Sequence, residues 1–150
     1  MKTSADPRHL ARKIAVSVEY AISNGSNDRE DTIETLISTT TDSLFIDIFD
    51  EKLLNLILST IKENRLDIDK LIKNNCKEWD LDKMYKTDLS ILTVAAAELK
   101  YLSTPQKVVV DEAVELAKEF GSAESSKFIN GVLAGIIVEI SKSKNDNGTN

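Results

Sequence analysis

Apolar side chains recur every three or four residues along most of this chain, a spacing that places them on one face of an α-helix. No alternation of apolar and polar residues persists long enough to predict a strand, and no internal repeat is visible. The pattern therefore predicts an all-α fold, a compact bundle of six or seven helices. The expected helical segments are 7–24, 28–40, 50–64, 66–76, 81–101 with a break allowed near 85–87, 105–120, and a last one that follows Ser122 and carries Ile129, Leu133, Ile136, Ile137 and Ile140.

Capping residues mark the ends of the last two helices. Thr104 can cap a helix whose first position is Pro105, where the missing amide proton costs nothing. Gly121 can turn left-handed just past the end of that helix, and Ser122 offers a cap to the next. We therefore expect 104–133 to form a tight helical hairpin.

Length and composition predict one domain, residues 1–142, followed by a disordered polar tail, Ser143–Asn150. Cys76 is the only cysteine, so it cannot form an intramolecular disulfide, and we interpret it as a packing residue. Trp79 is interpreted as a core anchor. No signal-peptide-like run and no apolar stretch of about 20 residues is present, which predicts a cytoplasmic protein with no membrane partner.

Charge is unevenly distributed along the chain, although its net value is −6. Residues 1–13 carry four basic side chains against one acid, a local charge of +3. Residues 28–52 carry eight acids against two basic residues, a local charge of −6. A small basic patch on an acidic body can contact phosphates locally, so RNA binding is allowed, but we expect it to be weak without a partner.

Recognisable catalytic chemistry is absent from the sequence. Five glycines form neither a Walker loop nor a dinucleotide fingerprint, and one histidine with one cysteine cannot make a zinc-ligand set. Asp111, Glu112 and Glu115 are interpreted as solvated first-turn residues that favour the helix dipole. Gly131 and Gly135 are interpreted as a close helix-packing pair inside the domain. We therefore predict a binding protein, not an enzyme, without metal or cofactor.

Three stretches resemble the NusB family of bacterial transcription antitermination factors. "VDEAVELAKEFGS" followed by "SKFINGVL" is similar to the family's C-terminal signature, "ARKIAVSVEY" to its first helix, and residues 79–99 to its central helices. The resemblance implies an all-helical protein that binds the single-stranded boxA element of ribosomal-RNA leader transcripts together with NusE, a small-subunit ribosomal protein. The pair would help the RNA polymerase elongation complex to pass terminators.

The resemblance also implies site residues by position. An RNA-contacting set would lie at the start of the first helix and near the start of the last: Arg8, His9, Arg12, Lys13, Lys127 and Phe128. A NusE-contacting set would be Tyr20, Asp88 and Glu124. Arginines can fork onto phosphates, and an aromatic side chain at the edge of a core can stack on an unpaired base. On the residues alone, Arg8 and Arg12 could equally form a solvated face, and Phe128 could complete a core.

Several positions depart from the family pattern. Arg8-His9-Leu10 stands where consecutive arginines are common, and Glu19, Thr93, Ala97 and Asp111 replace the usual apolar residue, arginine, tyrosine and asparagine. The basic face is thinner, which implies greater dependence on NusE. Two alternatives stay open: a helical protein-interaction scaffold with weak or lost RNA binding, and a helical module attached to a ribosomal-RNA cytosine methyltransferase. A homodimer also stays open.

Overall fold

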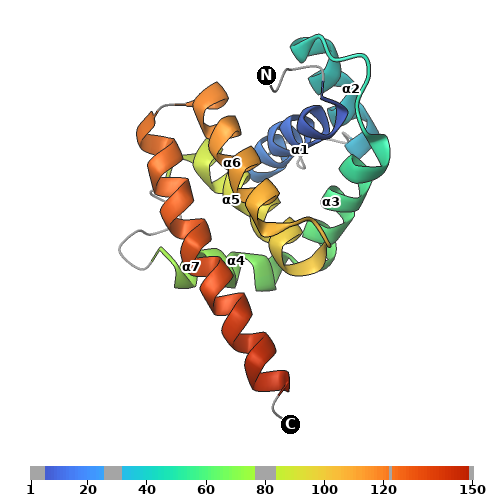
Figure 1. Ribbon diagram of the computed structural model, residues 1–150. Coiled ribbons are helices and arrows are strands. Elements are labelled where there is room, and N and C mark those ends of the chain that lie inside the picture. The colour runs from blue at the N-terminus through green and yellow to red at the C-terminus, as the bar shows by residue number, and fades with distance from the viewer. Residues whose placement is uncertain (1–5, 26–31, 77–83, 122, 149–150) are drawn as a thin grey trace. The chain divides into compact units, whose positions relative to one another are not determined.

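A computed structural model describes residues 6–25, 32–76, 84–121 and 123–148, and within these ranges it contains seven α-helices and no strand (Figure 1). The helices are α1 (Pro7–Ser23), α2 (Ile33–Leu44), α3 (Glu51–Glu63), α4 (Arg65–Asn74), α5 (Lys86–Tyr101), α6 (Gln106–Phe120) and α7 (Ala123–Gly148). The predicted all-α fold is confirmed.

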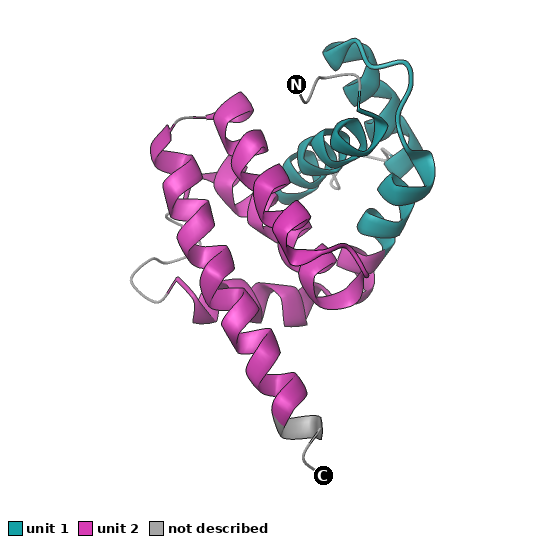
Figure 2. Cartoon of the chain, in the orientation of Figure 1, with its two compact units in different colours: residues 1–59 teal, residues 60–150 magenta. Residues whose placement is uncertain are grey.

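Two compact units divide the chain, residues 1–59 and residues 60–150 (Figure 2). Helix α3 carries the chain from the first unit into the second, since the boundary at Ser59 falls inside it. The expectation of one domain, residues 1–142, stays a prediction.

Helix α1 begins and ends where the sequence predicts. Pro7 occupies its first turn, and the Asp6 carboxylate accepts a hydrogen bond of 3.0 Å from the Arg8 amide. Residues Ala11, Ile14, Ala15 and Val18 are fully buried, and within the first unit α1 packs against α2. After Ser23 the chain turns at Gly25, whose φ of 93° is accessible mainly to glycine.

Helix α2 differs from its predicted bounds of 28–40. Residues 28–31 lie outside the described part of the chain, and the helix begins at Ile33 and continues to Leu44. The Thr32 hydroxyl caps it by accepting a hydrogen bond of 3.2 Å from the Thr35 amide. None of its residues is fully buried, which agrees with the weak apolar pattern of this threonine-rich segment.

Helix α5 forms the centre of the second unit, where α4, α6 and α7 all pack against it. Every residue from Ser90 to Leu99 is buried, as expected for a helix covered on all sides. It begins at Lys86, within the region where the sequence allows a break, and the buried Met84 lies just before it. Trp79 lies outside the described residues.

Helices α6 and α7 form the predicted hairpin, but its first cap differs from the prediction. Pro105 is the N-cap and makes no side-chain capping bond. Thr104 lies one position before this cap, and its hydroxyl donates a hydrogen bond of 3.0 Å to Glu98 Oε1. Thr104 thereby ties the hairpin to the end of α5.

The turn of the hairpin also differs from the prediction. Gly121 has φ −141°, which is not left-handed, and its amide donates a hydrogen bond of 2.8 Å to the Ala117 carbonyl. A Cβ at this position would lie 3.2 Å from both that carbonyl oxygen and Ser125 Oγ. Close approach of neighbouring atoms, not a left-handed turn, explains the glycine. Ser122, the second predicted cap, lies outside the described residues.

Helix α7 buries the predicted apolar stripe and runs further than predicted. Ile129, Leu133 and Ile136 are fully buried, and the helix extends to Gly148. The expectation of a disordered tail from Ser143 is therefore wrong up to Gly148, where the structure continues the helix.

Candidate nucleic-acid and protein interface

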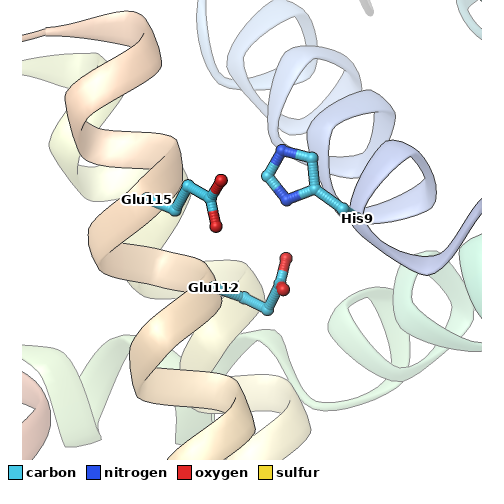
Figure 3. Close-up of side chains that lie close together, drawn as sticks. All are labelled: His9, Glu112 and Glu115. Atoms are coloured by element: carbon cyan, nitrogen blue, oxygen red, sulfur yellow. The ribbon is translucent and has the colours of Figure 1, made fainter. Parts of the chain in front are cut away.

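The predicted basic residues on α1 differ widely in exposure. Arg8 is exposed, Lys13 is half-buried, and His9 and Arg12 are almost fully buried, at 1% and 4% exposed. Figure 3 shows His9 extending from α1. Arg8 is therefore the arginine of this helix that can reach a phosphate without rearrangement of the protein.

Burial changes the meaning of Arg12. Among the described residues, no buried side-chain nitrogen or oxygen lacks a hydrogen-bond partner, so the Arg12 guanidinium is satisfied inside the protein. The reading of Arg8 and Arg12 as one solvated face is wrong, because only Arg8 is solvated. Removing a buried charged side chain leaves its partners unpaired and destabilises a protein, so Arg12 is a poor position for testing RNA contact.

The backbone at the start of α1 offers little to an anion. Pro7 has no amide proton, and the Asp6 carboxylate already accepts from the Arg8 amide. Helix N-termini often bind phosphate through free amides, but here a carboxylate takes that place. Contact with RNA at this end would come from side chains.

The second part of the predicted RNA set lies in the first two turns of α7. Lys127 is exposed, and Phe128 is half-buried beside the fully buried Ile129. The Ser126 hydroxyl donates a hydrogen bond of 2.8 Å to the Ala123 carbonyl and holds this turn. Phe128 is therefore partly accessible to solvent, as an aromatic side chain that stacks on a base requires.

The predicted partner residues in the second unit lie at the starts of two helices. Asp88 is in the first turn of α5 and is buried, at 5% exposed, whereas Glu124 in the first turn of α7 is exposed. The Ser125 hydroxyl donates a long hydrogen bond of 3.4 Å to Asp88 Oδ2. Burial raises the pKa of Asp88, and the bond from Ser125 lowers it. Glu124 is thus the acid that a partner can reach directly.

Tyr20, the third predicted partner residue, lies in the other unit, near the end of α1. The residue is 44% exposed, and its carbonyl accepts a hydrogen bond of 2.7 Å from Asn24 Nδ2. The structure therefore leaves this residue accessible. The predicted site residues fall into two groups. Those on α1 belong to the first compact unit, and those on α5 and α7 belong to the second.

The acids of α6 are not the solvated first-turn residues that we expected. The first turn of α6 contains no acid, Glu112 is buried at 2% exposed, and Glu115 is half-buried. Figure 3 shows Glu112 and Glu115 one turn apart on this helix. Of the three acids that we expected to be solvated, Asp111 alone is exposed, and it forms an ion pair of 3.4 Å with Lys107 one turn earlier.

Cys76 is buried just after α4, and burial raises the pKa of its thiol. A thiol held neutral is a poor nucleophile and metal ligand, which supports the packing role. No described helix of this chain combines the length and the apolar character that crossing a membrane would require.

Sequence reasoning missed Ser125, which joins α7 to Asp88. The sequence gives little indication of this contact, because a serine in the first turn of a helix is common whether or not it has a distant partner. It also missed that Thr93, at a family arginine position, is buried and bonds the Leu89 carbonyl at 2.8 Å. That site has no room for solvent contact, so the threonine fills an interior position.

Comparison with known proteins agrees with this arrangement of helices. The NusB family model matches residues 7–137. A transcription antitermination protein NusB from Finegoldia magna is 39% identical over 132 residues, which cover 87% of this chain and 93% of that protein. T. maritima NusB superimposes with a TM-score of 0.71 at 30% identity, covering 93% of this chain and 94% of the other.

A chain in the crystal structure of antitermination factors NusB and NusE in complex with double-stranded RNA shares the fold. Its TM-score is 0.71 at 22% identity, covering 87% of this chain and 96% of the other. The helices and their order therefore define the class of all-helical proteins to which these factors belong. The chain is a member of the NusB family.

Proposed function

We propose that this chain is a bacterial transcription antitermination factor that binds the boxA element of ribosomal-RNA leader transcripts together with NusE, without catalysing a reaction. The observation that carries the proposal is its family membership over residues 7–137, with relatives named as antitermination proteins. Such a factor works beside RNA polymerase, in the cytoplasm.

The side chains support two kinds of RNA contact. Arg8 is an exposed cation at the start of α1, and Lys127 and Phe128 offer a cation and an aromatic face on α7. Since His9 and Arg12 are buried, the exposed basic surface of α1 is small. A thin cationic surface predicts weak RNA binding by the protein alone and a gain when NusE is bound.

The test is a titration of a boxA RNA with the protein–NusE complex at several salt concentrations. Arg8→Ala should weaken binding and reduce the log–log salt slope by about 0.7, the value for one lost phosphate contact with a single strand. Phe128→Leu keeps an apolar side chain but removes the ring. It should weaken binding by an amount within the range of about 1–3 kcal/mol for a stacked base, without changing the slope.

Lys73→Ala is the matched control. Lys73 is exposed on α4, and its replacement also removes one positive charge. It should leave affinity and slope close to those of the wild type. If Arg8→Ala behaves like Lys73→Ala, the first helix does not contact RNA. If the complex does not bind boxA RNA at all while NusE still binds, the scaffold alternative replaces the proposal.

A further inference from the structure

An exposed acidic segment joins α2 to α3 in the first unit (Figure 1). Residues 42–51, here called the acidic loop, contain four acids and no basic residue. Two large apolar side chains are presented among these acids, Phe45 at 92% exposed and Ile48 at 76% exposed. Strongly exposed apolar side chains contribute little to folding stability, and several of them together are typical of an interaction site.

The backbone at Phe45 is unfavourable for its residue. Phe45 follows the last residue of α2 with φ 56°, and among the described residues it is the only non-glycine with positive φ. Its amide bonds the Asp42 carbonyl at 3.3 Å, and the Ile46 amide bonds the Thr41 carbonyl at 2.9 Å. This is the Schellman arrangement, in which the left-handed position is usually glycine because a Cβ is crowded there.

The charge at the same helix end is also unfavourable. Asp42 lies in the last turn of α2, and that turn contains no basic residue. The C-terminus of a helix carries partial negative charge, so an acid there destabilises the helix slightly. A strained aromatic residue, an exposed isoleucine and a misplaced acid occur within seven residues, and such local conflicts are typical of functional surfaces.

The acidic loop lies beside the start of α1. The Asp50 amide donates a hydrogen bond of 3.0 Å to the Pro7 carbonyl, which comes immediately before Arg8. Both residues belong to the first unit. The loop thus adjoins a candidate RNA contact while carrying the charge that repels phosphate.

Charge and shape together select one kind of occupant. RNA is excluded by the four acids, and a second copy of a chain with net charge −6 is disfavoured for the same reason. A basic protein surface with an apolar pocket is complementary, because acids steer it and an aromatic side chain anchors it. An adjacent basic protein would also offset the repulsion between the loop and RNA.

We propose that the acidic loop is a docking surface for a basic protein, anchored by Phe45 and Ile48, and that this protein is NusE. The identity of the partner rests on the proposed function; the location and chemistry of the surface rest on the exposure, backbone and charge of these residues.

The test is calorimetry with purified NusE and the variant Phe45→Gly, alone and combined with Ile48→Ser. Each should bind NusE at least ~10-fold more weakly than the wild type, the scale of a lost anchor residue. Glycine suits the left-handed position, so the denaturant midpoint of Phe45→Gly should equal or exceed that of the wild type. Lost binding then cannot come from lost folding.

Leu66→Ser is the matched control, since Leu66 is 86% exposed but lies on α4 outside the acidic loop. It should bind NusE as the wild type does. NusE affinity of the double variant within twofold of the wild type overturns the docking surface and leaves the proposed function standing. Absence of NusE binding by the wild type overturns both. A change confined to self-association, or to boxA RNA binding without NusE, assigns the loop to another occupant and overturns the proposal.

Discussion

Gly131 and Gly135 lie one turn apart on α7, yet their surroundings differ. A Cβ at Gly131 would meet nothing within 4 Å, whereas a Cβ at Gly135 would lie 2.4 Å from Asn75 Oδ1. Asn75 cannot move aside freely, because its Nδ2 bonds the Leu71 carbonyl at 2.8 Å and Glu139 Oε1 at 3.2 Å. The predicted close-packing role is therefore confirmed at Gly135 and wrong at Gly131.

Opposite effects of alanine should follow at these two glycines. Gly131→Ala should raise the free energy of unfolding by about 0.5–1 kcal/mol, because alanine restricts the unfolded chain and favours the helix. Gly135→Ala should lower it by about 1–3 kcal/mol through overpacking. Urea denaturation of the two variants measures both values, and equal shifts would mean that α7 does not approach Asn75.

A second pair of helices is joined by Asp67 on α4. The Lys100 ammonium forms an ion pair of 2.5 Å with Asp67 Oδ2, and the Tyr101 hydroxyl donates a hydrogen bond to the same oxygen. The bonds from Lys100 and Tyr101 hold the pKa of Asp67 below its ordinary value. Burial and the nearby carboxylate raise the pKa of Tyr101 to about 12.

Stability should therefore depend on the ionisation of Asp67. Because its pKa is lowered on folding, the ionised form stabilises the protein above its ordinary pKa of 3.8, and that contribution disappears as the pH falls through the lowered value. Asp67→Asn should lower the free energy of unfolding at neutral pH by about 0.2–1 kcal/mol, a small value because water screens a partly exposed pair. Denaturant melts at neutral and strongly acidic pH check this, and the difference should vanish in acid.

At the scale of elements, the sequence predicts the bodies of helices better than their ends. Apolar spacing identifies α1, α3 and α4 closely because their buried stripes are continuous, and it allows the break before α5. The ends are less well predicted: α6 begins one residue later than expected, so that Pro105 and not Thr104 is at the cap position. Helix α2 was misplaced because its weak stripe gives no signal for its limits.

The middle of α7 and its C-terminal end should contribute very differently to stability. Leu133 is fully buried, so Leu133→Ala should cost about 2–5 kcal/mol. Residues 141–145 are exposed, so deletion of 143–150 should cost little although the helix continues to Gly148. Denaturant melts of the two variants compare the costs, and a large loss from the deletion would show that the end of α7 has a packing partner.

At the scale of the whole molecule, the candidate site was only partly predictable. The resemblance supplies positions, and helical spacing gives faces, but neither reveals that His9, Arg12 and Asp88 are buried. Burial of a charged side chain depends on hydrogen-bond partners that come together only in the folded chain. The acidic loop was not predicted as a surface, because no sequence pattern indicates that Phe45 is exposed or that its backbone is left-handed.

Binding of NusE should be sensitive to Glu124 more than to the carboxylate charge of Asp88. Glu124→Lys reverses an exposed charge and should weaken binding of a basic partner about tenfold, with a steeper loss at low salt. Asp88→Asn is the suitable change at the buried position, since lysine there would disrupt the contact with Ser125. It should alter NusE affinity less. Calorimetry at two salt concentrations checks both, and unchanged affinity for Glu124→Lys removes this residue from the interface.

The enclosure of α5 by α4, α6 and α7 also determines how slowly parts of the second unit exchange amide protons with solvent. Amides in the buried stretch from Ser90 to Leu99 can exchange only when the surrounding helices separate, so their rates should report global opening. Amides of α7 beyond Ile140, where side chains are exposed, should exchange through local fraying, orders of magnitude faster. The end of α7 should therefore open and close many times for each opening that exposes the amides of α5.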